Sequence, residues 1–316
     1  MSSPLAEVRE MRANLLWRML ATLGAPAGAE PIVKTAVDPE CALVLGSMHG
    51  KHDARAAELT LWLGAAARRS LSVIRAKRIA AEVGAEAQAD LGQFAATAMA
   101  TNLGELRLWA KRLGSDSHDP WPIDYSPGRL GDRIGGAQSI ESVVAQPGAF
   151  RLRMRMAIGA GARAEALAML MVEARSWEGR GPAWLTLPQI EAGTAFGKRF
   201  LLDCLPDMAA AGLIMHEREG RLHAFAADPA LIKGVASIPT VWDVWPRRLS
   251  LLASIESALR ELKHERTITN VMAQARLLAT TAPLVVPFDP HADPDLLPQE
   301  FEDWCLRATK LLVDIK

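Results

Sequence analysis

The stretch of sequence that decides the fold is WLTLPQIEAGTAFGKRFLLDCLPDMAAAGLIMHEREGRLHAFAAD, residues 184–228. A short β bridge is expected at 185–187. A short helix should follow over 189–192, because Pro188 suits the first turn of a helix. A longer helix is expected over 197–211. The segment therefore predicts two helices joined by a tight turn.

The residues between these helices have the character of a turn that packs against a small core. Gly193 allows a positive φ, and Phe196 can fill the space between the helices. The longer helix carries Leu201, Leu205 and Met208 at helical spacing, which predicts one buried face.

A hairpin and a supporting helix complete the unit. Gly212 ends the longer helix, and two short strands are expected to turn at Glu219-Gly220. Upstream, apolar residues recur at helical spacing over 161–174. This order of elements is typical of a winged helix-turn-helix, which lays one helix against a nucleic-acid groove.

Within this unit we expect the DNA contacts to come from the start of the longer helix and from the hairpin. Lys198 and Arg199 begin the helix that would meet phosphates and base edges, and Thr194 would cap it or contact a phosphate. The full set of predicted DNA-binding residues is Thr194, Gly197, Lys198, Arg199, Arg218, Arg221 and His223.

Two residues of the same helix weaken the expectation of sequence-specific readout. Pro206 removes one helical hydrogen bond, and Leu202 occupies a position that could face the groove. Winged helices also dock proteins, since a fold does not determine a function. The leading hypothesis is a DNA-binding transcriptional regulator without a catalytic step, and the alternative is a helical protein-interaction module.

Three motifs resemble a family. FRLRMRMAIGAGARAEALAML (150–170), LTLPQIEAGTAFGKRFLLDCLPDMAAAGLI (185–214) and DPECALVLGSMHGKHDARAAELTLWL (38–63) are similar to segments of a widespread group of bacterial winged-helix proteins. Members of this group are mostly described as transcriptional regulators. The resemblance covers roughly residues 38–230 and implies DNA binding, but it names no operator, regulated gene or effector.

Composition limits how such a protein could bind DNA. The 316 residues include 36 Lys plus Arg and 36 Asp plus Glu, so the formal net charge is zero. A neutral chain lacks a global positive field, and any DNA contact must come from a local patch. We therefore expect a homodimer, with the first and last helices as candidate dimer elements. Double-stranded DNA is the expected partner. The three isolated cysteines indicate buried, reduced thiols, which favours a cytoplasmic protein. No membrane span is expected.

The expected fold class is mainly α, with a multi-helix N-terminal region, a central winged helix-turn-helix with a small β-hairpin wing, and a helical C-terminal region. The predicted boundaries are 1–113 for the N-terminal domain, 114–147 for a linker or surface loop rich in Gly, Pro, Asp and Ser, 148–230 for the winged unit and 231–316 for the C-terminal region.

The remaining motifs of the sequence predict no catalytic site, metal site or cofactor. His49 and His52 have helical spacing, but no third ligand is predictable, and Asp53 is better explained as a helix cap. The glycine-rich segments at 128–136 and 158–163 lack the remaining residues of a phosphate loop or a dinucleotide fingerprint.

Three arginines and one tryptophan leave their roles open. Arg151, Arg153 and Arg155 could touch phosphates beside the winged unit, or could be solvated or ion-paired with a neighbouring domain. Trp121, between two prolines, is expected to be more exposed than the other tryptophans and could line a pocket or a subunit interface.

Overall fold

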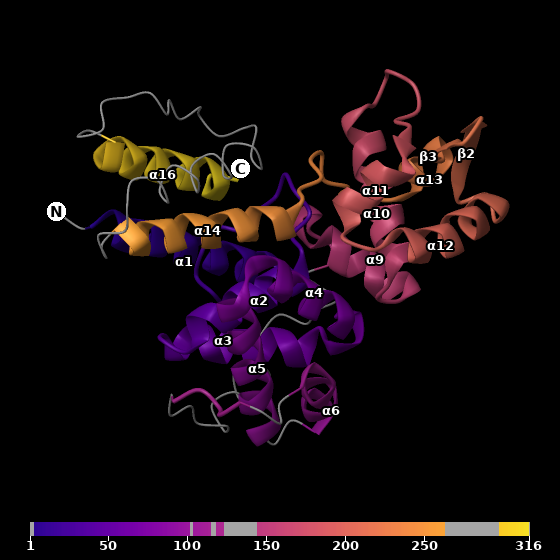
Figure 1. The fold of residues 1–316 in the computed structure, drawn as a ribbon. Helices are drawn as coiled ribbons and strands as arrows, with labels where there is room; N and C mark the ends of the chain where they lie inside the picture. The colour runs from indigo at the N-terminus through magenta and orange to yellow at the C-terminus, as the bar shows by residue number, and fades with distance from the viewer. Residues whose placement is uncertain (1–2, 102–103, 115–117, 123–143, 263–296, 316) are drawn as a thin grey trace.

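The structure is a computed structural model that describes residues 3–101, 104–114, 118–122, 144–262 and 297–315 (Figure 1). It is mainly helical, with one small antiparallel sheet and a helical C-terminus, as predicted. Most of the expected loop at 114–147 lies outside the described residues, so its role as a domain boundary stays a prediction.

The N-terminal helices form the largest part of the core. They are α1 (Pro4–Thr22), α2 (Pro39–Gly50), α3 (Ala54–Ala66), η1 (Arg68–Ser70), α4 (Val73–Val83), α5 (Ala85–Ala100) and α6 (Gly104–Leu113). Asp53 caps α3, as the sequence predicts, and Asp38 caps α2 in the same way, because each carboxylate accepts hydrogen bonds from the first backbone N–H groups of its helix.

Two C-terminal helices return to this N-terminal part. Helix α14 (Trp245–Leu262) buries Trp245 and Leu249 in the core of the N-terminal helices, and α16 (Leu297–Val313) packs on α1 and α14 (Figure 1). The apolar side chains of the first and last helices, such as Val8 and Trp304, thus share one core within the chain. Their proposed role in a dimer remains a prediction, and these buried faces are not available for it.

The second part of the molecule lies beside the N-terminal helices and has its own core (Figure 1). Its elements are η2 (Pro147–Ala149), α9 (Phe150–Ile158), α10 (Ala162–Ser176), β1 (Leu185–Thr186), α11 (Leu187–Thr194), α12 (Lys198–Ala210), β2 (Ile214–Glu219), β3 (Leu222–Ala227) and α13 (Pro229–Gly234). The strands form a sheet in the order β1-β3-β2, with Leu185 opposite Phe225 and Ile214 opposite Ala227.

Helix α11 is longer than predicted, for a local reason. Thr186 and Gln189 form a capping box that starts the helix two residues earlier, with the Thr186 N–H donating to Gln189 Oε1 at 2.8 Å. The helix ends at Thr194 and is followed by Ala195, which adopts the left-handed conformation with φ 56°.

The prediction of a positive φ at Gly193 is therefore wrong. Gly193 is needed for close packing instead, because a Cβ there would lie 2.4 Å from the methyl carbon of Met169. Phe196 packs against this core as expected, and α12 continues through Pro206.

Candidate nucleic-acid interface

The start of α12 presents two exposed cations. Lys198 and Arg199 are both exposed, and within the described part of the chain neither side chain has an ion-pair partner. The helix N-terminus is already occupied by a carboxylate, because Glu191 Oε1 accepts the Lys198 N–H at 2.8 Å. Glu191, which the sequence analysis did not single out, holds the position where helix N-terminal N–H groups would otherwise attract a phosphate.

Beyond its first turn, the exposed face of α12 is mixed in character. Phe200 and Leu202 are 54% and 42% exposed. Asp203 and Asp207 add negative charge, and Asp207 pairs with Arg163 of α10 at 2.8 Å. Favourable contacts with phosphate are therefore concentrated at the beginning of this helix.

The β2–β3 hairpin carries the second group of predicted residues. Arg221 is exposed, and Arg218 donates from Nε to the Gly220 carbonyl at 3.0 Å. His223 is half-buried, and its ring stacks on His216 with 3.0 Å between Nδ1 and the His216 Nε2. The side chains of Arg218 and Arg221 are thus exposed to solvent, whereas the ring of His223 is engaged within the hairpin.

The prediction that Thr194 contacts DNA is corrected by its burial. Thr194 is fully buried, and its hydroxyl donates to the Ile190 carbonyl at 2.7 Å. Its own carbonyl accepts a hydrogen bond from Arg75 Nε of α4 at 3.3 Å. Thr194 therefore belongs to the contact between the two parts of the molecule and not to the exposed surface.

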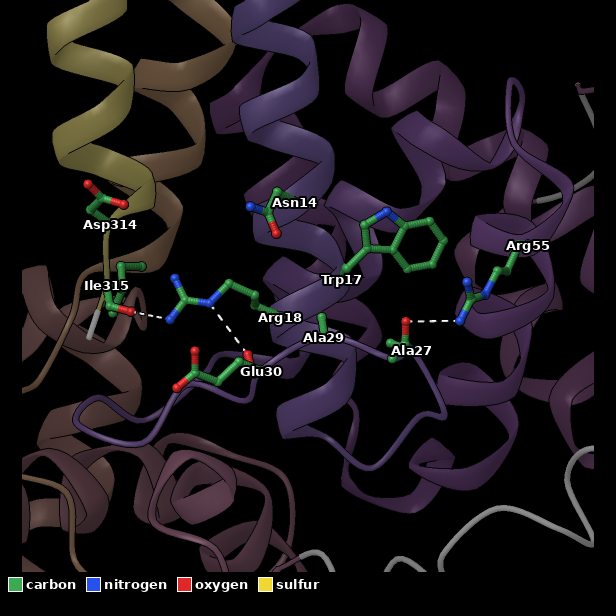
Figure 2. A pocket seen from close by; sticks show the side chains of 10 residues that line it. Asn14, Trp17, Arg18, Ala27, Ala29, Glu30, Arg55, Asp314 and Ile315 are labelled. Atoms are coloured by element: carbon green, nitrogen blue, oxygen red, sulfur yellow. Dashed lines mark hydrogen bonds between the residues drawn. The ribbon is translucent and has the colours of Figure 1, made fainter.

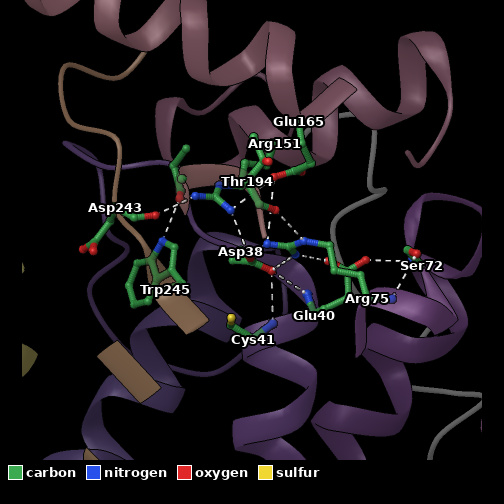
Figure 3. Close-up of polar contacts among 12 residues, drawn as sticks. Asp38, Glu40, Cys41, Ser72, Arg75, Arg151, Glu165, Thr194, Asp243 and Trp245 are labelled. Atoms are coloured by element: carbon green, nitrogen blue, oxygen red, sulfur yellow. Dashed lines mark hydrogen bonds and ion pairs between the residues drawn. The ribbon is translucent and has the colours of Figure 1, made fainter. Parts of the chain in front are cut away.

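Near this turn lies a cluster of six buried charged side chains, hereafter the buried ion cluster, of which Figure 3 labels all but Arg155. It consists of Asp38 and Glu40 of the α2 N-terminus, Arg75 of α4, Arg151 and Arg155 of α9, and Glu165 of α10. Three guanidinium groups and three carboxylates give it a formal charge of zero, and every side chain is at most 1% exposed.

Each carboxylate of the cluster is shared by at least two arginines. Asp38 pairs with Arg75 and with Arg151, the latter at 2.7 Å. Glu40 accepts from Arg75 at 2.7 Å and from Arg155 at 2.6 Å. Glu165 pairs with Arg155 at 2.6 Å and with Arg151 at 3.2 Å. The pairs thus link helices from both parts of the molecule.

The arginines keep two of these carboxylates, Asp38 and Glu165, ionised. Burial alone would raise the pKa of Asp38, but Arg75 and Arg151 together outweigh it and hold the pKa far below its ordinary value. Burial likewise opposes ionisation of Glu165, and Arg155 and Arg151 lower its pKa below the ordinary value. Any loss of one partner would leave a buried charge without its counter-ion.

The buried ion cluster decides between the two interpretations of the α9 arginines. Arg151 and Arg155 are ion-pair partners of the N-terminal helices, and burial removes them from any phosphate. Arg151 also donates to the Asp243 carbonyl at 2.6 Å and lies over the Trp242 ring. Arg153 donates to the carbonyls of Ala236 and Ser237.

One cation outside residues 184–228 lies near the start of α12. The guanidinium of Arg78, on α4, is 4.0 Å from the place where a Cβ on Gly197 would be. Arg78 is exposed, and no ion pair within the described ranges engages it. The sequence carries a Lys77-Arg78 pair there, but nothing local indicates that it faces α12.

Two cavities among the described residues lie away from α12 and the hairpin. A cavity of about 610 Å³ is lined by α1, the loop at 27–30, Arg55 and residues 314–315 (Figure 2). Its two cations are bound to backbone carbonyls, Arg18 to Glu30 at 3.4 Å and Arg55 to Ala27 at 2.9 Å.

A second cavity, of about 460 Å³, is lined by His49 and His52. The first of these rings accepts a hydrogen bond from Arg12 Nε at 3.2 Å. Within the described residues no group of three His, Cys, Asp or Glu side chains is arranged to hold a metal ion. Neither cavity includes a residue of α12 or of the hairpin.

Two other expectations are resolved by packing. Trp121 is 4% exposed and packs on Phe94, so the prediction of an exposed Trp121 is wrong. Cys41, Cys204 and Cys305 are free and buried, as predicted.

None of the helices in the described ranges combines the length and apolar character that crossing a bilayer requires.

Comparison of the chain with known protein families, with curated proteins and with solved structures found no match.

Proposed function

We propose that residues 162–227 form a winged helix-turn-helix and that the chain is a DNA-binding transcriptional regulator. The order α10, β1, α11, α12, β2, β3 supports this fold. The observation that carries the function is the pair of exposed cations at the start of α12, Lys198 and Arg199, which form no ion pair with any residue that the structure describes.

In this proposal the first turn of α12 meets the major groove, and the hairpin lies along the backbone. Arg218 and Arg221 contact phosphates there. Past the first turn, Leu202 and Asp203 offer no hydrogen-bond donor to a phosphate. Affinity should therefore depend mainly on phosphate contacts and hence on salt. A homodimer would double the few contacts that one chain provides.

The test is the salt dependence of duplex binding. Fluorescence anisotropy of a labelled 20-bp duplex is measured between 50 and 200 mM salt for the wild type and for Lys198→Ala/Arg199→Ala. Loss of two phosphate contacts should reduce the slope of log K against log salt by about 1.8, at about 0.9 for each contact.

The matched control is Lys111→Ala/Arg112→Ala, which removes two exposed cations from α6, well apart from α12 in Figure 1. This variant should bind like the wild type. An unchanged slope and affinity in the α12 double variant would refute the proposed function.

A protein-docking function is the second candidate, because α12 exposes apolar surface. Phe200 and Leu202 are 54% and 42% exposed on the same helix as the two aspartates. Exposed apolar side chains beside polar ones are typical of protein interfaces. If the wild type binds no duplex at 50 mM salt, a protein-interaction module is the better description of this chain. Phe200→Ser/Leu202→Ser would then abolish the interaction with the partner.

A further inference from the structure

Helix α4 lies beside the turn before α12 at two places along that turn, Thr194 and Gly197. Arg75 donates to the carbonyl of Thr194. Three residues further along both segments, the guanidinium of Arg78 lies beside Gly197, the residue that precedes α12. The two contacts place one side of α4 along the path by which the chain enters α12.

Helical geometry selects Arg78 over its neighbour. Residues three apart on an α-helix are separated by about 60° around the axis, whereas residues two apart are separated by about 160°. Arg78 is therefore on nearly the same side of α4 as Arg75, which faces the second part of the molecule. Lys77 is also exposed but lies on the opposite side from Arg75.

The buried ion cluster fixes the position of the α4 backbone, which carries Arg78. Arg75 is held by Asp38 and Glu40, and the same carboxylates are held by Arg151 and Arg155 of α9. The backbone of α4 is thus tied to the part that carries α12. A cation whose backbone is already fixed loses less conformational freedom when it binds.

The local charge favours an anion. Arg78, Lys198 and Arg199 are exposed cations without ion pairs in the described part of the chain. The facing carboxylate is Glu191, which is bonded to the Lys198 N–H. Glu82, one turn further along α4, is the exposed acid on that helix. At the first turn of α12 and the adjoining side of α4, the three cations outnumber Glu191 and Glu82, and the next exposed acid, Asp203, lies one turn further along α12.

We propose that Arg78 binds a phosphate of the same DNA duplex, so that α4 of the N-terminal helices forms part of the DNA interface. This inference rests on the proposed function. The bound strand would then cross from the start of α12 onto α4, and the N-terminal helices would contribute directly to affinity. The winged segment is consequently only part of the binding surface.

The experiment compares two adjacent exposed cations on one helix. Anisotropy with the 20-bp duplex is measured for Arg78→Ala, Lys77→Ala and Arg78→Lys over the same salt range. Arg78→Ala should reduce the slope by about 0.9 and weaken binding about eightfold at 0.1 M salt. Lys77→Ala should change affinity less than twofold. Arg78→Lys should retain most of the binding because the charge remains. Circular dichroism and the urea midpoint verify that all variants fold.

The outcomes separate this inference from the proposed function. If the wild type binds and Lys198→Ala/Arg199→Ala weakens binding, but Arg78→Ala behaves like Lys77→Ala, the role of Arg78 is refuted while the proposed function stands. If the wild type does not bind the duplex, both fail. A selective loss in Arg78→Ala supports both.

Discussion

Replacement of Glu165 by glutamine should destabilise the protein strongly, because the residue is fully buried between arginines. Its Oε1 accepts from Arg155 Nε at 2.7 Å, and its Oε2 lies 3.2 Å from Arg151 Nη1. Glutamine keeps the shape but leaves three buried cations facing two carboxylates. Breaking a buried ion pair by removing one partner costs about 3–5 kcal/mol. We expect a loss of this size in the free energy of unfolding.

Urea unfolding, followed by tryptophan fluorescence and circular dichroism, measures this loss. With an m-value of about 3 kcal/mol/M, the midpoint of Glu165→Gln should fall by about 1–1.7 M. The matched control is Glu173→Gln on the same helix, since Glu173 is half-buried and has no ion pair within the described residues. The control should change stability by less than about 0.5 kcal/mol. Equal midpoints for the two variants would refute the assigned role of the cluster.

Glu165→Gln should also change how the free energy of unfolding depends on pH. The pKa values of Asp38 and Glu165 lie below their ordinary values in the folded state, because the arginines outweigh the effect of burial. As pH falls through the ordinary carboxylate range near 4, the unfolded chain binds protons first. Stability is therefore present above this range and is lost below it. As the pH falls through the ordinary glutamate range, Glu165→Gln should lose less stability than the wild type, by at most about 1.4 kcal/mol per pH unit.

Three further substitutions test other parts of the molecule. Burial lowers the pKa of His49 to about 3, so only the unfolded chain takes up a proton between pH 6.5 and 4. The urea stability of the wild type should fall over this range by about 1.4 kcal/mol per pH unit more than that of His49→Gln, and parallel pH profiles would contradict this. Glu191→Gln should tighten duplex binding in the anisotropy assay, because it removes a carboxylate from the Lys198 N–H where a phosphate would approach. Unchanged or weaker binding would show that no phosphate comes near this position. Gly148→Ala should lower the free energy of unfolding by about 1–3 kcal/mol, because its Cβ would lie 2.0 Å from the Ile32 carbonyl oxygen. A urea midpoint of Gly148→Ala equal to that of the wild type would contradict this packing.

Features that depend on neighbouring residues were predictable from the sequence. The caps at Asp38 and Asp53 act within three residues, and the hairpin turn at Gly220 needs only its local positive φ. The buried face of α12 follows from the spacing of Leu201 and Leu205. Such features report local geometry, which the sequence encodes directly.

Features that depend on distant residues were not predictable. Arg151 pairs with Asp38, which is 113 residues away, and no local pattern reveals that partner. Trp121 is covered by Phe94, although the prolines beside it suggest an exposed loop. Thr194 was assigned to the surface from its place in the turn, but the structure buries it below α4.

The most direct test of the account is the salt dependence of wild-type binding to a 20-bp duplex. The proposed contacts per chain come from Arg78, Lys198, Arg199, Arg218 and Arg221. If each neutralises one phosphate, log K should fall with log salt with a slope of about −4.5 per chain. A measured slope near this value supports DNA binding through this surface. No binding at 50 mM salt, or a slope near zero, would contradict it.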